Sequence, residues 1–284
     1  MKHLLCAFLL GVATAAERPS LWLWLFQDVD RSLQQALTHR SIVSAVGITG
    51  FGMDAHGQMQ SEPNATVVRT LVGAGIEVHG LCAINSMATL RLLSADAERV
   101  FFADAIAAAL RNNISGYNMD FEPYAEATTL TNADGLLYAS FLHRFALALH
   151  KTGRLVLTVD TFTNLPMWNL AAINGTAVDR VITMDTYVQE NRTFEAYAAV
   201  ASAYVAPTRL GIGMCAAIST SRSPYGPDPC PAEAWSDEQL AERFAWLQSH
   251  AHRYSQINVW VLPLPDNWWA ALTKFVSRRD VYGS

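Results

Sequence analysis

A short stretch of the chain, residues 116–123 with the sequence GYNMDFEP, places polar side chains at every second position. Asn118, Asp120 and Glu122 therefore share one side if the stretch is a strand, because successive side chains point to opposite faces. A neighbouring carboxylate and an apolar wall both raise the pKa of a glutamic acid, which suits Glu122 to general acid catalysis. A departing glycosidic oxygen needs such a proton. The alternative is a structural pair of carboxylates held by Arg or backbone groups.

The elements that would position these residues recur along the chain. Nearly continuous apolar runs, as expected of strands buried on both faces, occur eight times. Helical patterns lie between them, the clearest beginning at Phe101, Leu137, Ser236 and Trp268. This alternation predicts a single-domain (β/α)8 TIM barrel, with an open doubly wound sheet as the alternative. The expected strands are residues 21–26, 41–49, 76–84, 115–122, 154–162, 179–187, 208–216 and 257–265.

In such a barrel the active site lies at the carboxyl ends of the strands. Glu122 would end the fourth strand, and Pro123 would stop it. Asp120 and Asn118 would lie below Glu122 on the same inward side. Polar groups in a barrel core are costly unless they are hydrogen-bonded, so we expect a polar network there.

The first residues are typical of a targeting segment. Lys2 and His3 precede an apolar run at residues 4–12, and Ala13, Thr14 and Ala15 offer a small-residue cleavage site. We therefore expect residues 1–15 to be a signal peptide and residues 16–284 to be the mature barrel. The alternative is a buried N-terminal helix. A signal peptide implies secretion or delivery to a lysosomal or vacuolar lumen.

Cysteines and glycosylation sequons agree with that route. Cys215 and Cys230 flank a loop rich in Ser, Pro and Gly, and a disulfide closing it would contribute about 3 kcal/mol. Cys82 lies in an apolar run and is expected to be a buried free thiol. Sequons that could carry glycans occur at Asn64, Asn174 and Asn191, and a fourth at Asn113 lies close to the polar strand.

Composition excludes several other classes of function. The chain of 284 residues has a formal net charge of −5, and 16% of its residues are charged. No basic run, Gly-rich phosphate loop or zinc-type Cys/His spacing is present in the sequence. We therefore expect no nucleic-acid or membrane partner, no metal and no cofactor, and we expect a monomer.

The polar strand resembles the signature of glycoside hydrolase family 18, the chitinases and their relatives. That family carries D-G-x-D-x-D-x-E on its fourth barrel strand. Gly116, Asp120 and Glu122 match it here, whereas Ser115 and Asn118 replace two aspartates. Asparagine at the second position is also found in the di-N-acetylchitobiase-like branch, whose motif is close to G-x-N-x-D-x-E.

Two further strands resemble the family. The stretch DRVITMDTY at residues 179–187 is similar to the sixth-strand pattern D-x-V-x-x-M-x-Y-D, with Met184 in place. Thr186 and Tyr187 stand where the family has Tyr and Asp, and either Tyr187 or Asp185 can substitute if the strand end is bulged. Trp260, on the eighth strand, occupies the place of the family's tryptophan beneath the −1 sugar.

The resemblance implies hydrolysis of β-1,4-linked N-acetylglucosamine oligosaccharides or glycan ends. In this family the substrate's own 2-acetamido group replaces an enzyme nucleophile. Glu122 would be the general acid and base, Asp120 would orient the acetamido N–H, and Asn118 would supply an amide hydrogen bond below Asp120. About forty residues separate the seventh and eighth strands, too few for the α+β insertion of larger chitinases, which predicts a shallow cleft. A non-catalytic oligosaccharide-binding lectin and a hydrolase of another glycan are the alternatives.

Overall fold

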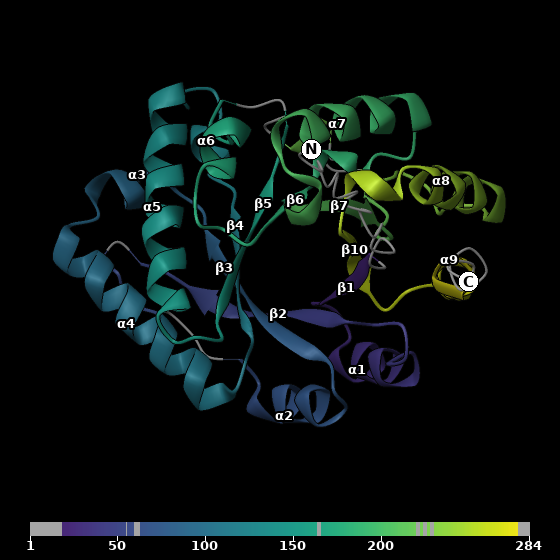
Figure 1. Ribbon diagram of the computed structural model, residues 1–284, viewed down its shortest axis with the longest axis horizontal. Coiled ribbons are helices and arrows are strands. Elements are labelled where there is room, and N and C mark those ends of the chain that lie inside the picture. The colour runs from purple at the N-terminus through teal and green to yellow at the C-terminus, as the bar shows by residue number, and fades with distance from the viewer. Residues whose placement is uncertain are drawn as a thin grey trace, which may run out of the picture.

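A closed barrel of parallel strands forms the centre of the protein, which we describe from a computed structural model (Figure 1). The segment 1–15, expected to be a signal peptide, lies outside the described residues. The structure describes residues 19–54, 56–59, 63–163, 166–219, 222–223, 226–227 and 230–277.

The strands follow one another around the barrel in the order β1-β10-β7-β6-β5-β4-β3-β2. Ser20 of β1 pairs with Gln256 of β10, and this pairing closes the sheet and excludes the open doubly wound alternative. The predicted TIM barrel is confirmed, and each of the eight expected strands is present. The barrel strands are β1 (Ser20–Leu25), β2 (Ala45–Gly52), β3 (Glu77–Ile84), β4 (Gly116–Phe121), β5 (Val156–Thr161), β6 (Arg180–Thr183), β7 (Leu210–Cys215) and β10 (Gln256–Leu262).

Helices surround the barrel in a ring and cover the outer face of the sheet (Figure 1). No helix in the described ranges is long and apolar enough to cross a membrane. The helices are α1 (Val29–Thr38), α2 (Ala65–Gly73), α3 (Met87–Leu92), α4 (Ala95–Asn112), α5 (Asn132–His150), α6 (Leu170–Asn174), α7 (Asn191–Tyr204), α8 (Asp237–Ser249) and α9 (Asp266–Ser277).

Side-chain caps fix where the longer helices begin. Thr131 accepts from the backbone N–H of Asp134, whose carboxylate in turn accepts from the backbone N–H of Thr131, so α5 begins with a capping box. Ser236 and Gln239 form the same reciprocal arrangement at α8. These contacts satisfy backbone donors that the first turn of a helix leaves unpaired.

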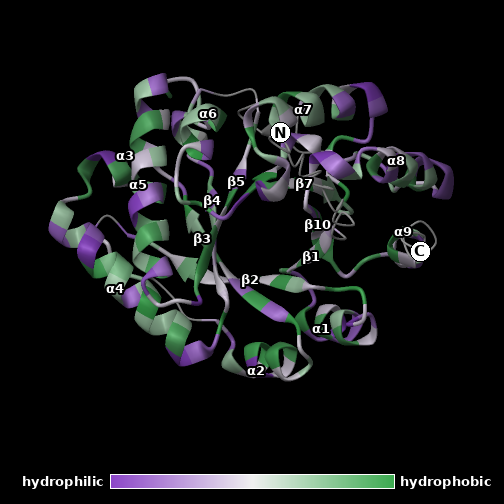
Figure 2. Ribbon diagram, viewed as in Figure 1, coloured by the Kyte–Doolittle hydropathy of each residue, from purple (hydrophilic) through white to green (hydrophobic). Residues whose placement is uncertain are grey.

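Hydrophobic packing between the helices and the outer face of the sheet makes up most of the core. The helices α4 and α5 carry both hydrophilic and hydrophobic residues (Figure 2). Four phenylalanines of these helices pack together and against Tyr117 of β4, with ring centroids 5.0 to 6.2 Å apart, as aromatic clusters prefer. The four are Phe101, Phe102, Phe141 and Phe145.

The chain between β7 and β10 is short, as predicted. In its described part it holds α8, the 3-10 turn at Ala251–Arg253, and two short strands, β8 (Arg222–Ser223) and β9 (Gly226–Pro227). No α+β insertion is present among these described residues.

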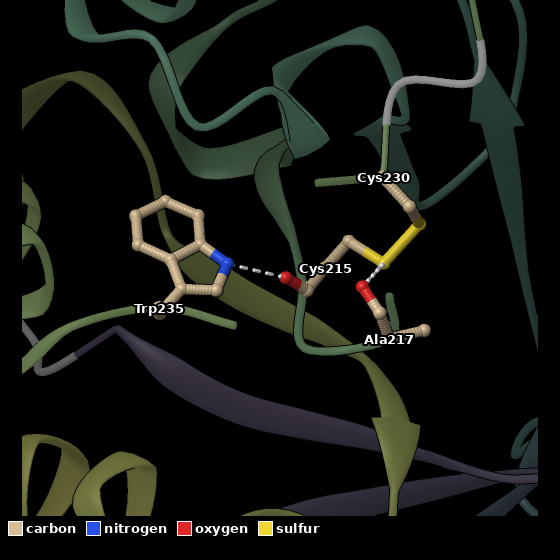
Figure 3. Close-up of a disulfide and its surroundings, with 4 residues drawn as sticks. All are labelled: Cys215, Ala217, Cys230 and Trp235. Carbon is tan, nitrogen blue, oxygen red and sulfur yellow. Dashed lines mark hydrogen bonds between the residues drawn. A yellow bond between two sulfur atoms is a disulfide. The ribbon is translucent and has the colours of Figure 1, made fainter. Parts of the chain in front are cut away.

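A disulfide ties the start of this connection to the end of β7 (Figure 3). Cys215 and Cys230, the two cysteines expected to pair, are bonded, with their Cα atoms 5.4 Å apart. The indole N–H of Trp235 donates to the carbonyl oxygen of Cys215 over 2.8 Å, and the Sγ of Cys215 lies 3.6 Å from the carbonyl oxygen of Ala217. Cys82 is a buried free thiol, as expected.

Candidate active site

The alternation in β4 directs its polar side chains to the inside of the barrel. The hydroxyl of Tyr117 donates to a carbonyl oxygen of α4 over 2.7 Å, and the ring of Phe121 packs against α5, so these two side chains face outward. Asn118 and Asp120, on the opposite face of the strand, therefore face the barrel interior. Glu122 follows at the carboxyl end of the strand and remains partly exposed.

Asn118 joins β4 to β5 through its amide. This side chain is fully buried, and its Nδ2 donates to Oγ1 of Thr158 over 2.9 Å and to Oδ1 of Asp160 over 3.0 Å. Both acceptors lie on β5. The amide of Asn118 therefore bonds to the neighbouring strand β5.

The carboxyl groups around Asn118 are held in a low-dielectric environment. The Oδ1 of Asp120 is buried and has no hydrogen-bond partner. Burial, and then the charges of Glu122 and Asp160, raise the pKa of Asp120 well above its usual range. Asp160 is 4% exposed, and burial raises its pKa to about 8 although the hydrogen bond from Asn118 opposes the shift. Burial and the neighbouring carboxylates thus both favour the protonated forms of these carboxyl groups.

Glu122 is held in place by its backbone and by the turn that follows it. Its backbone N–H donates to the carbonyl oxygen of Ile84 over 3.1 Å, which extends the pairing with β3 by one residue. After Pro123 the chain makes a 3-10 turn that ends at Glu126. The carboxylate of Glu126 accepts from Ser86 Oγ over 3.1 Å, and from backbone N–H groups at the start of α3. The loop after β4 is thus fastened to the loop after β3.

The sixth strand does not bulge; it ends at Thr183, before the residues expected to bind substrate. Met184 follows, and Asp185–Tyr187 form a 3-10 turn. Thr186 is fully buried, and its hydroxyl donates to the carbonyl oxygen of Gly213 on β7 over 2.9 Å. Thr186 therefore serves as packing at the position where the family has a tyrosine.

Asp185 lies at the carboxyl end of the barrel, between β6 and the loop after β5. One carboxylate oxygen accepts from the backbone N–H of Thr163 over 2.7 Å and from the Thr163 hydroxyl. The other oxygen is buried without a partner. Burial raises the pKa of Asp185 to about 6.

Tyr187 and Met184 are mostly buried at this end of the barrel, each 6% exposed. The ring of Tyr187 lies against Gly213, where an added Cβ would come within 2.6 Å of a ring carbon. A glycine on β7 therefore makes room for the tyrosine that follows β6. The backbone N–H of Tyr187 donates to the carbonyl oxygen of Met184 over 3.0 Å, which closes the turn.

Trp260 of β10 belongs to an aromatic group at the carboxyl end of the first and last strands. Its ring centroid lies 6.1 Å from that of Trp24 and 5.5 Å from that of Phe26. Trp24 is buried and occupies the space that Gly47 leaves by lacking a Cβ. Phe26 is 50% exposed, so the group runs from the barrel core to solvent.

Three of the four sequons, at Asn64, Asn174 and Asn191, differ in their surroundings. Asn64 is exposed and caps α2 by accepting from the backbone N–H groups of Thr66 and Val67. Asn174 accepts from Arg209, and Asn191 donates to Glu242 over 3.1 Å and accepts from the buried Arg243. Among the described residues, no group of His, Cys, Asp and Glu is arranged to hold a metal ion.

Comparison with known proteins bears on the fold. No family model and no curated protein matches the sequence. Solved structures do match, among them a chitinase from Chromobacterium violaceum at 15% identity, covering 91% of this chain and 99% of that one, with a TM-score of 0.71. The chain shares the fold of this structure. A family GH18 chitinase from Cycas revoluta in complex with allosamidin has 11% identity, coverage of 92% and 99%, and a TM-score of 0.65.

A spore cortex-lytic enzyme shares the same fold. SleL of Bacillus megaterium is similar over 90% of this chain and 74% of its own, at 12% identity and a TM-score of 0.73. The resemblance stated from the three strand motifs is thus confirmed at the level of the fold.

Asp160 is the residue of this site that sequence reasoning missed. The run 154–162 was recognised as a strand, but its acidic residue was not connected with Asp120. The signal was present, because Thr158 and Asp160 alternate with Leu157 and Val159 as the polar residues of β4 alternate with apolar ones.

Proposed function

We propose that the protein is a glycosidase that hydrolyses β-1,4-linked N-acetylglucosamine oligosaccharides or glycan ends. The observation that carries the proposal is the position of Glu122 at the carboxyl end of β4, next to Asp120, whose Oδ1 is buried and whose pKa is raised. A carboxyl group in that position can hold a proton where a glycosidic oxygen would depart. The shared fold of chitinases and SleL supports the same substrate class.

The proposed reaction is substrate-assisted and retains the anomeric configuration. The 2-acetamido carbonyl oxygen attacks the anomeric carbon while Glu122 donates its proton to the leaving oxygen, and the glycosidic bond breaks. Asp120 accepts a hydrogen bond from the acetamido N–H and stabilises the positive charge of the cyclic intermediate. Glu122 then removes a proton from a water molecule as that water attacks the anomeric carbon. The bond between this carbon and the acetamido oxygen breaks, and Glu122 is protonated again.

The substrate would be held by residues at the ends of β6 and β10. In this proposal Asp185 and Tyr187 contact the −1 sugar from the 3-10 turn, Met184 lines the site below them, and Trp260 stacks beneath the sugar ring. The exposed ring of Phe26 extends that aromatic surface. The short connection between β7 and β10 favours a shallow cleft and therefore short oligosaccharides.

We further propose that the protein acts outside the reducing cytosol, in a secreted or lumenal compartment. The disulfide between Cys215 and Cys230 supports this, because such bonds persist in oxidising environments. Residues 1–15 would then be the signal peptide, and Asn64, exposed at the start of α2, a sequon accessible to glycosylation.

The test compares the parent protein with Glu122→Gln on fluorogenic N-acetylglucosamine di- and trisaccharides between pH 4 and 8. We expect loss of about 10² to 10⁴ in kcat, with KM little changed, because a general acid contributes that much. Glu98→Gln, which alters a carboxylate paired with Arg144 far from the barrel interior, is the matched control.

Two results would argue against the proposal. Equal activity in the parent and Glu122→Gln would remove Glu122 from the chemistry. Oligosaccharide binding without hydrolysis by either protein would indicate a lectin on this barrel.

A further inference from the structure

The register of two strands brings a second aspartate beside Asp120. In the parallel pair β4 and β5, Asn118 lies opposite Thr158 and Met119 lies opposite Val159. Asp120 and Asp160 are the next residues along the two strands, and the charge of Asp160 acts on Asp120. Both side chains point into the barrel, since each is two residues beyond a side chain of the Asn118 network.

Hydrogen bonding is incomplete at this pair. The Oδ1 of Asp160 accepts from Asn118, whereas the Oδ1 of Asp120 is buried and accepts from no group. A buried carboxylate oxygen without a donor is costly, particularly beside another negative charge. A proton carried by Asp160 would supply the missing donor.

The surroundings of the pair are acidic or neutral. Glu122 lies beside it at the end of β4, while Tyr138 of α5 and Cys82 of β3 lie on the outer side of the sheet and interact with it only electrostatically. The causes of both carboxyl shifts are burial, other carboxylates and the Asn118 amide, with no cation of the described chain among them. Two adjacent carboxylates in such a place cannot both ionise at little cost.

We propose that Asp120 and Asp160 form a carboxyl pair across β4 and β5 that holds one proton between them. Asp160 is then a positioning residue, which fixes the charge and the orientation of Asp120 from the neighbouring strand. Asn118 completes the unit by holding Asp160 through its amide. The catalytic part of this inference rests on the proposed function, in which Asp120, as one member of the pair, accepts a hydrogen bond from the acetamido N–H.

The proton can be observed without substrate, by infrared spectroscopy of protein labelled with ¹³C at the aspartate carboxyl carbon. We expect the parent to show a protonated aspartic acid band at pH 7 that disappears at more alkaline pH, near or above 8. Asp185, whose pKa is raised to about 6, is largely ionised at pH 7 and contributes little to this band.

Two variants assign the band. Asp160→Asn preserves the shape of the side chain and removes one of the two carboxyl groups, and we expect it to shift the band's alkaline midpoint. Thr158→Val is the control, because it removes the other acceptor of Asn118 on the same strand and leaves both carboxyl groups. The absence of a protonated band in the parent at pH 7, or an unchanged alkaline midpoint in Asp160→Asn, would overturn the proposal.

The pH profile of kcat/KM is a second test of the positioning role of Asp160. The alkaline limb should move by at least one pH unit in Asp160→Asn and stay in place in Thr158→Val; an unmoved limb in Asp160→Asn would refute the positioning role. If the parent cleaves none of the oligosaccharides, the proposed function fails, while the infrared titration still decides whether the pair holds a proton.

Discussion

Asp185 provides a test of the site's electrostatics that needs no substrate. It is 3% exposed, one of its oxygens has no partner, and burial raises its pKa to about 6. The ordinary value, which an unfolded chain retains, is 3.8. Between those two values the folded protein binds more protons than the unfolded chain, so the free energy of unfolding decreases as pH rises from about 4 to about 6.

The size of the effect follows from the shift. About two pKa units correspond to about 3 kcal/mol of stability that is fully present below pH 3.8 and is lost as the pH rises through about 6. The side chain in Asp185→Asn cannot ionise, so the variant does not lose this stability as the pH rises. We therefore expect the difference in unfolding free energy, variant minus parent, to increase by about 2 kcal/mol between pH 4 and pH 7.

Urea unfolding at half-unit pH intervals measures this difference. Any constant cost of the altered contact with Thr163 cancels, because only the change with pH is compared. Asp104→Asn, at an exposed position on α4, serves as the control for removal of one surface charge. A variant-minus-parent difference that stays constant across this range, or one that falls, would refute the reasoning.

Two further predictions concern packing and the disulfide. Gly47→Ala should destabilise the protein by about 1 to 3 kcal/mol, because the new Cβ would lie 2.0 Å from a ring carbon of Trp24. Gly73→Ala, at an exposed helical position with nothing within 4 Å, is the control and should be neutral or stabilising. Equal urea midpoints for the two variants would contradict this expectation. Replacing Cys215 and Cys230 together by alanine should cost about 3 kcal/mol in unfolding free energy, measured without reductant, and an unchanged midpoint would show that the bridge does not constrain the unfolded chain.

The sequence predicted the barrel because its strands are buried on both faces and read as continuous apolar runs. Helices such as α1 and α7 were not singled out, since their shorter patterns mix small and polar residues on the outside of the barrel. Their helical state depends more on packing against the sheet than on a strong local signal.

The candidate site was only partly predictable. Asn118, Asp120 and Glu122 stood out because they are consecutive on one strand face. The partnership of Asp120 with Asp160 depends on the register of β4 and β5, which a single sequence does not specify. The end of β6 was likewise open, since whether Met184 begins a bulge or a 3-10 turn is decided by contacts with β7 such as that of Thr186 with Gly213.

In the proposed function, Glu122 at the end of β4 is the general acid for cleavage of a glycosidic bond, and the 2-acetamido group of the substrate is the nucleophile. The most direct measurement is kcat/KM for two fluorogenic disaccharides that differ only in having a 2-acetamido or a 2-hydroxyl group. We expect hydrolysis of the acetamido substrate with retained configuration, no detectable hydrolysis of the hydroxyl substrate, and loss of the activity in Glu122→Gln. Comparable hydrolysis of both substrates would contradict it.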